Sequence, residues 1–236
     1  MNRTETISVP RNVERVQERM RAAQRRAGRA GEITLVAIGK LVVPERIAEA
    51  YAAGVRHVGE NRVQECEGKR RSLDLPKATW HMVGHLQTNK AEHALELFDR
   101  VDSLDSLRLA GKLSAAAEKL GRRLPVLIQV HLGDEPSKHG VNPAELPGFV
   151  EQVAQLNALA VKGLMTIPPY LEPPERVRPF FRCLGELAQQ IARRRIPGIE
   201  MGVLSMGMSH DFEVAIEEGA SEVRLGTALF GARPAR

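Results

Sequence analysis

The sequence predicts a single (β/α)8 barrel, an α/β fold of the TIM-barrel class with an extra N-terminal helix, and three observations predict it. Eight short apolar segments alternate with helix-like patterns. The apolar segments are almost continuous, as in parallel strands that are buried on both faces. No Ser/Gly-rich linker or change of composition divides residues 1–236, so we expect one domain. An open doubly wound sheet is the alternative, although no GxGxxG motif follows the first expected strand.

The first half of the chain begins with a helix and continues with four strand–helix units. Residues 9–28 predict an amphipathic helix, because apolar side chains recur there at three- and four-residue steps, and residues 1–30 form an extension in front of the barrel. Pro44 fits the first turn of a helix, where its missing N–H leaves no hydrogen bond unmade. Short apolar runs predict strands at 33–38, 55–59, 80–83 and 100–103. Helical patterns follow them at 44–54, from 61 onward, at 88–97 and at 106–120.

The second half repeats the same unit. Strands are expected at 124–132, 161–167, 200–204 and 223–226, and the first of these has the clearest apolar run. Helices are expected at 143–156, 175–194 and 210–218, and a short helical turn follows the last strand. The aromatic content of 4% implies that the core between these elements is aliphatic.

The composition is that of an ordinary soluble protein, with 43% hydrophobic and 27% charged residues. No run of about 18 apolar residues is present, so we expect no membrane-spanning segment. The polar N-terminus does not resemble a signal peptide. The two cysteines, Cys66 and Cys183, form no CxxC pair and favour a reducing compartment. We therefore expect a cytoplasmic protein.

The net charge of +5 does not by itself indicate a nucleic acid partner. Arginines gather at 21–29 and at 193–195, but no aromatic side chains are interleaved with them for stacking on bases. We therefore expect solvated helix faces at these places and no nucleic acid binding. An anionic small molecule would also suit a basic chain, although net charge alone does not identify one.

A lysine at the end of the first expected strand is the first candidate for chemistry. In (β/α)8 barrels the active site lies at the carboxyl ends of the strands, and Lys40 follows the strand at 33–38. Desolvation disfavours the charged form of an amine, and a neutral amine is what Schiff-base chemistry requires. A lysine whose head reaches solvent from a strand end is the alternative interpretation.

The loops after the seventh and eighth strands have the features of a phosphate site. Barrels commonly bind phosphate between these two loops, which here read SMGMSHDFE and LGTALFG. Ser209 is expected to cap the helix that follows and to direct its free N–H groups at the ligand. Gly207 and Gly226 are expected to let the backbone approach a ligand closely, and Ser205, Ser209 and Thr227 offer hydroxyls.

Other polar side chains near the strand ends are candidates for catalysis or metal binding. Arg224 lies in the last strand and is either a cation in the barrel mouth or an outward arginine in a salt bridge. His81 and His85 are four residues apart, but they lie on a strand and lack the HExxH pattern, so we expect no metal. The adjacent residues Ser209, His210 and Asp211 cannot adopt the geometry of a catalytic triad.

Eight segments of the chain match a known family in order and in combination. They are LVAIGK at 35–40, GENRVQE at 59–65, WHMVGHLQTNK at 80–90, VDSLDS at 101–106, PVLIQVHLGDEPSKHG at 125–140, GLMTIPP at 163–169, LSMGMSHDFEVAIEEGA at 204–220 and VRLGTALFGAR at 223–233. On these segments the chain resembles the pyridoxal 5′-phosphate homeostasis (YggS/PROSC-like) family, which is related to the alanine racemase N-terminal barrel.

The resemblance implies a site for pyridoxal 5′-phosphate (PLP) on the same rim of the barrel. It implies that Lys40 holds the cofactor covalently as an internal aldimine, that Arg224 faces the pyridine nitrogen and that Asn61 lies beside the ring. It implies a phosphate site at Ser205, Ser209, Gly226 and Thr227, and a pocket that is also lined by His85 and Met165.

This chain departs from the family pattern at two places. Gly39 stands where serine is usual, immediately before the lysine, and we expect it to affect local backbone stiffness rather than the Schiff base. His131 stands where asparagine is commoner, at the end of the fifth strand.

The expected function is to bind PLP and supply it to apo-enzymes without robust catalysis, and no catalytic residue is expected. An arginine cannot accept a proton from a pyridinium, so the ring nitrogen beside Arg224 stays unprotonated and the ring is a poor electron sink. The resemblance implies that racemases of this class add a tyrosine base from another domain. Neither Tyr51 nor Tyr170 is expected to serve as that base. The carrier is expected to be a monomer or a weak dimer.

Three other functions remain open from the sequence alone. A PLP-dependent amino-acid racemase of the same barrel class would use the same lysine. A Schiff-base aldolase that acts on a sugar phosphate also requires a strand-end lysine and a phosphate loop. The third is a nucleic-acid-binding module, for which the basic patches are the only support.

Overall fold

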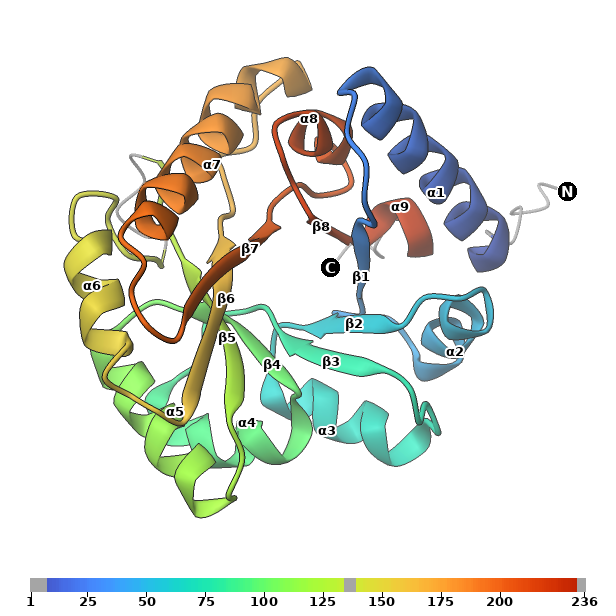
Figure 1. Cartoon of the computed structure of the whole chain (residues 1–236). Helices are drawn as coiled ribbons and strands as arrows, with labels where there is room; N and C mark the ends of the chain where they lie inside the picture. The colour runs from blue at the N-terminus through green and yellow to red at the C-terminus, as the bar shows by residue number, and fades with distance from the viewer. Residues whose placement is uncertain (1–7, 134–138, 233–236) are drawn as a thin grey trace, which may run out of the picture.

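Eight parallel strands close into a barrel, and helices surround it (Figure 1). The computed structural model describes residues 8–133 and 139–232. The strands follow one another around the barrel in chain order, and the last pairs with the first. They are β1 Thr34–Ile38, β2 His57–Glu60, β3 Thr79–Met82, β4 Arg100–Leu104, β5 Leu124–Gln129, β6 Leu159–Met165, β7 Ile199–Ser205 and β8 Glu222–Leu225. The predicted (β/α)8 architecture is confirmed.

The helices lie outside the barrel (Figure 1), and each α-helix has buried residues. They are α1 Val9–Arg26, α2 Pro44–Ala52, α3 Val63–Ser72, α4 Ala91–Leu97, α5 Leu107–Lys119, α6 Leu146–Val153, α7 Arg178–Arg193, α8 Phe212–Glu217 and α9 Thr227–Phe230. The 3₁₀ turns η1 Thr88–Lys90 and η2 Pro174–Val177 precede α4 and α7. In α7, for example, the buried Phe181, Leu184, Ala188 and Ile191 recur at three- and four-residue steps.

The N-terminal helix belongs to the ring of helices around the barrel. Helix α1 packs against α2, α8 and α9, and buries the apolar stripe that the sequence predicted. Two of the arginines in the N-terminal basic patch contact α8 and the loop that follows it. Arg26 pairs with Glu217 at 2.7 Å, and Arg29 donates to the backbone carbonyls of Ile216 and Ala220. These contacts account for part of the basic patch without a nucleic acid.

The element bounds differ from the prediction where loops take over the ends of strands and helices. The strand predicted to end at residue 132 ends at Gln129, because the backbone there turns to meet a later loop through a bridge between Val130 and Val141. The helix predicted from 175 begins with the turn η2 and becomes α-helical only at Arg178. No helix in the described part of the chain is both long and apolar enough to cross a membrane.

A buried polar network lies inside the barrel. His57 Nδ1 lies 2.9 Å from His81 Nε2, and His81 Nδ1 lies 3.0 Å from an oxygen of Asp102. Arg100 forms a two-pronged hydrogen bond with Asp102 and also bonds Glu222. Each carboxylate therefore has a guanidinium partner in a place where an unpaired charge would be costly. This pairing explains why His81 and Asp102 can be fully buried.

Candidate functional site

The predicted lysine lies between two neighbouring strand ends that carry other predicted residues. Strand β1 pairs with β2 on one side and with β8 on the other. Lys40 comes two residues after β1, Asn61 directly after β2 and Gly226 directly after β8. The half-buried Lys40 is thus flanked by both loops at the carboxyl end of the barrel.

Most of the predicted residues line cavities on this rim, and they are divided among three of them. Lys40, Asn61 and His85 line a cavity of about 380 Å³. Asn61 and His85 also line a second cavity of about 220 Å³, together with His131 and His139. A third cavity, of about 430 Å³, is lined by Ser209, Arg224, Gly226 and Thr227, together with Ile38, which lies two residues before the lysine.

Arg224 points into the barrel mouth, which decides between the two interpretations that the sequence left open. Its guanidinium donates hydrogen bonds of 2.7 Å to the Ser205 hydroxyl and to the Thr166 carbonyl. Burial lowers the pKa of Arg224, but the group remains a cation at any physiological pH because its ordinary pKa is above 12. The two acceptors fix the guanidinium plane against the wall of the third cavity.

Two predicted pocket residues lie beneath the rim. Ser205 is fully buried and accepts the hydrogen bond from Arg224, so in this structure its hydroxyl supports the guanidinium. Met165 is also fully buried, at the end of β6. The sequence placed both at strand ends correctly, but it could not tell which side chains are covered by their neighbours.

The prediction that Ser209 caps the helix after β7 is wrong. Helix α8 begins at Phe212, and Asp211 precedes it and accepts a hydrogen bond of 2.6 Å from the Met208 N–H. The Ser209 hydroxyl instead accepts hydrogen bonds from the N–H groups of Gly226 and Ala228, at 3.3 and 3.1 Å. It therefore joins the two predicted phosphate loops, and these two N–H groups point at an oxygen acceptor.

Tyr170 lies closer to the site than the sequence suggested. It belongs to the loop after β6 and lines the same cavity as Arg224 and Thr227. Its ring packs on His210, with 4.6 Å between the centroids. Its hydroxyl donates to Glu172 at 2.6 Å, and this hydrogen bond raises the pKa of the phenol.

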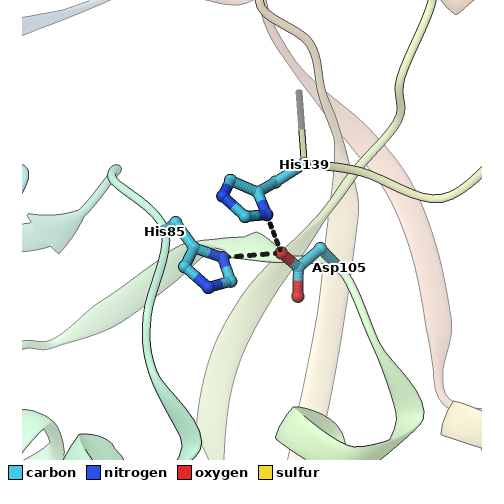
Figure 2. Close-up of side chains that lie close together, drawn as sticks. All are labelled: His85, Asp105 and His139. Carbon is cyan, nitrogen blue, oxygen red and sulfur yellow. Dashed lines mark hydrogen bonds and ion pairs between the residues drawn. The ribbon is translucent and has the colours of Figure 1, made fainter. Parts of the chain in front are cut away.

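Three further side chains gather where β3, β4 and the loop after β5 meet (Figure 2). His85 Nδ1 lies 2.9 Å and His139 Nδ1 3.8 Å from the same oxygen of Asp105. The two rings are stacked, 3.6 Å apart and 9° from parallel. Because ring nitrogens bind a metal in the plane of the ring, two parallel stacked rings cannot both direct Nδ1 at one ion. The arrangement fits two imidazoles that share one carboxylate.

Sequence reasoning did not select Asp105 or His139. Asp105 directly follows β4, so the strand-end criterion that selected Lys40 could also have selected it. His139 reaches the cluster from a loop, and no periodic pattern in the sequence marks its position. His81, which lies four residues before His85 in the sequence, lies in the barrel interior and contacts His57 and Asp102 instead.

The site combines an amine, a fixed cation and anion-binding backbone groups. The Lys40 amine can react with a carbonyl carbon. Arg224 and the N–H groups that now contact Ser209 can bind anionic oxygens. A ligand that carries both an aldehyde or ketone and a phosphate group would engage both halves of the site.

Comparison with known proteins identifies the family. The family described as "Alanine racemase, N-terminal domain" matches residues 12–234. The pyridoxal phosphate homeostasis protein of Aquifex aeolicus is 45% identical over 99% of both chains, and that of Escherichia coli K12 is 41% identical over 95% of this chain and 97% of its own.

Solved structures agree with this result. PipY of Synechococcus elongatus, solved with PLP bound, is 40% identical with a TM-score of 0.80, covering 90% of this chain and 99% of PipY. Alanine racemase of Clostridium difficile is 14% identical with a TM-score of 0.74, covering 95% of this chain and 57% of the racemase, which shows a shared fold only. With near-complete matches at 40–45% identity and the same closed barrel, the chain belongs to the pyridoxal phosphate homeostasis protein family.

Proposed function

We propose that this protein binds PLP on the carboxyl rim of the barrel and supplies it to apo-enzymes that need it. The observation that carries the proposal is the placement of Lys40 beside the loop that contains Gly226, on neighbouring strands of one barrel. The PLP bound to PipY, a relative at 40% identity, supports the same cofactor here.

The residues on the rim fit the three parts of the cofactor. Lys40 would hold the aldehyde carbon through a covalent C=N bond. Thr227 and the N–H groups of Gly226 and Ala228 would bind the phosphate, and the Ser209 hydroxyl would turn from acceptor to donor. Arg224 would face the ring nitrogen, and Asn61 would lie beside the ring in the cavity that it shares with Lys40.

The bound cofactor supplies an aldehyde that exchanges between amines, which is the chemistry that loading and release require. Arg224 has hydrogen-bond donors and no acceptor, so it would donate to an unprotonated ring nitrogen and could not accept from a protonated one. Two acceptors, the Ser205 hydroxyl and the Thr166 carbonyl, hold its orientation. A ring with an unprotonated nitrogen would be in the form least able to stabilise a carbanion.

A carrier without robust catalysis fits the groups that surround the lysine. Racemisation requires a second base on the face opposite Lys40. Tyr170 lines the cavity of Arg224 and not the cavity of Lys40, and its hydroxyl donates to Glu172. Among the described residues, no tyrosine lines the cavity that contains Lys40, which favours the carrier over a racemase of the same barrel class.

The test follows the transfer of PLP and the turnover of amino acids in the same preparation. Loaded protein is mixed with an apo-enzyme that requires PLP, and recovery of that enzyme's activity is compared with recovery on an equal amount of free PLP. We expect transfer from the wild type and from Lys112→Ala, but no covalent loading of Lys40→Ala. Lys112 is the control because it is an exposed lysine on α5, outside the barrel.

Alanine and serine racemisation is measured in parallel by chiral chromatography. We expect rates close to those of free PLP. Turnover at about 1 s⁻¹ or faster would replace the carrier with a racemase. Failure of the wild type to retain PLP would overturn both functions.

A further inference from the structure

A buried ion pair lies directly behind the segment that carries Lys40, on the outer side of the barrel wall. Glu60, the last residue of β2, is fully buried, and Lys69 of α3 is 8% exposed. Lys69 Nζ lies 2.6 Å from Glu60 Oε1 and donates a second hydrogen bond, also of 2.6 Å, to the Gly39 carbonyl. That carbonyl belongs to the peptide that joins Gly39 to Lys40.

A second contact from the same helix holds the residue on the other side of the lysine. The Leu41 N–H donates to a carboxylate oxygen of Glu65 at 3.3 Å. Leu41 has a φ of 61°, in the left-handed region that costs a residue with a side chain about 1–2 kcal/mol. Glu65 also lies 4.0 Å from Lys69. Helix α3 therefore holds both flanks of Lys40 in a turn that the backbone alone would not favour.

The Glu60–Lys69 pair explains locally why position 39 is a glycine. A Cβ on Gly39 would overlap Glu60 Oε1 and touch the Ile47 side chain. Two backbone hydrogen bonds complete the turn: the Gly39 N–H donates to Gly59, and the Val42 N–H donates to the Gly39 carbonyl. The carboxylate thus occupies the space that a larger residue before Lys40 would need.

Burying this ion pair contributes less to stability than burying apolar side chains in the same place would. Burying two charges costs more than their attraction returns unless every remaining polar atom is satisfied. In the described part of the chain, Glu60 Oε2 is the buried side-chain oxygen or nitrogen that has no hydrogen-bond partner. Burial outweighs the attraction of Lys69 and raises the pKa of Glu60 to about 7. Packing alone would be served better by apolar side chains, so the pair points to a positioning role.

We propose that Glu60, Glu65 and Lys69 form a clamp that fixes the Gly39–Leu41 turn and thereby aims the Lys40 amine at the carbonyl carbon of its ligand. The clamp rests on the proposed function for the identity of that ligand. The clamp residues are positioning residues that act through the backbone on either side of Lys40.

The experiment compares variants that release the clamp with a control on the same helix. The double variant Glu60→Gln/Lys69→Met removes both charges together, so that neither is left buried alone. Glu65→Ala removes the acceptor of the Leu41 N–H. Glu67→Ala is the control, because Glu67 lies on α3 but pairs with Arg71, away from the turn.

Two binding measurements separate positioning from general damage. The rate at which PLP becomes covalently attached is followed by visible absorbance, and the affinity for pyridoxine 5′-phosphate, which lacks the aldehyde, is measured by calorimetry. We expect attachment to slow about tenfold to a hundredfold in both clamp variants, as misplacement of a reacting group does. We expect the affinity for the aldehyde-free analogue to change less than about twofold, since its contacts do not depend on the amine.

A third measurement needs no cofactor. The apo protein is acetylated with limiting acetic anhydride, and the modification of Lys40 relative to Lys90 is read by peptide mass spectrometry. We expect this ratio to change in the clamp variants and to stay at the wild-type value in Glu67→Ala.

Wild-type attachment rates and an unchanged acetylation ratio in both clamp variants would overturn the clamp. Equal losses of attachment and analogue affinity would also overturn it, because they indicate general disruption of the rim. If the wild type itself attaches no PLP, the proposed function fails, and the acetylation ratio still decides the clamp.

Discussion

At the scale of single residues, the site is defined by which of its polar atoms already form hydrogen bonds within the protein. Arg224 donates hydrogen bonds to Ser205 and Thr166, and the Ser209 hydroxyl accepts hydrogen bonds from the N–H groups of two loop residues. Thr227 lines the same cavity, and no hydrogen bond of its hydroxyl competes with a ligand among the contacts of the described residues. The groups that already form hydrogen bonds are the scaffold of the site, and the Thr227 hydroxyl is available for the proposed contact with the phosphate.

Thr227→Val should therefore weaken PLP binding while leaving covalent attachment possible. The variant keeps the shape of the side chain and removes one hydrogen bond to a charged group, which is worth about 1.5–3 kcal/mol. Calorimetric titration of the apo protein measures the loss, with Thr88→Val, a change of the same kind in η1, as the control. An affinity equal to that of the wild type would place the phosphate elsewhere on the rim.

At the scale of elements, the sequence predicted the strand ends well and the loops between them poorly. Apolar runs locate the strands, and the strand-end rule then placed Lys40, Asn61 and Gly226 on one rim, because all parallel strands end on the same side. The partner of Ser209 was missed because the hydroxyl reaches the next loop, 17 residues away, instead of the helix beside it. Local capping patterns carry no information about such contacts.

The junction of β1 and β2 gives a prediction at this scale. Gly39→Ala should destabilise the protein by about 1–3 kcal/mol, the usual cost of forcing an extra carbon into a packed site. The cost should shrink when the substitution is made in Glu60→Ala, which empties the space that the new Cβ requires. Urea unfolding of the four proteins of this double-mutant cycle measures the coupling. Costs that simply add would show that Glu60 does not restrict position 39.

At the scale of the whole molecule, the amphipathic pattern of the first helix predicted its buried stripe but not its partners. Helix α1 closes the ring by packing on the last two helices, α8 and α9, and such distant partners cannot be derived from periodicity. The sequence also did not predict the polar network inside the barrel, because His57, His81 and Asp102 lie on strands in which apolar residues dominate the pattern. The sequence therefore predicted the architecture and missed the charges that are buried within it.

Those buried charges predict how stability depends on pH. Burial and the neighbouring His81 lower the pKa of His57, whereas burial raises the pKa of Glu60 to about 7. The folded state binds fewer protons than the unfolded chain at His57, so the stability it contributes is lost as the pH falls below about 6.5. At Glu60 the folded state binds more protons, so stability is lost as the pH rises from 4.5 toward 7.

Glu60→Gln should remove the second effect and leave the first. The free energy of unfolding of the variant, relative to the wild type, should therefore increase by about 1–3 kcal/mol between pH 4.5 and pH 8. Urea unfolding at a series of pH values measures this difference, and Glu67→Gln is the exposed control on α3. Parallel curves for the wild type and Glu60→Gln would show that Glu60 does not titrate abnormally.

The proposed function depends on which residue PLP becomes attached to. The most direct measurement is to load the protein with PLP, reduce it with borohydride, and locate the added mass by peptide mass spectrometry. The account predicts one stoichiometric modification, on Lys40, and its loss in Lys40→Ala. A stoichiometric modification on Lys90 or another lysine, or none at all with PLP in excess, would contradict it.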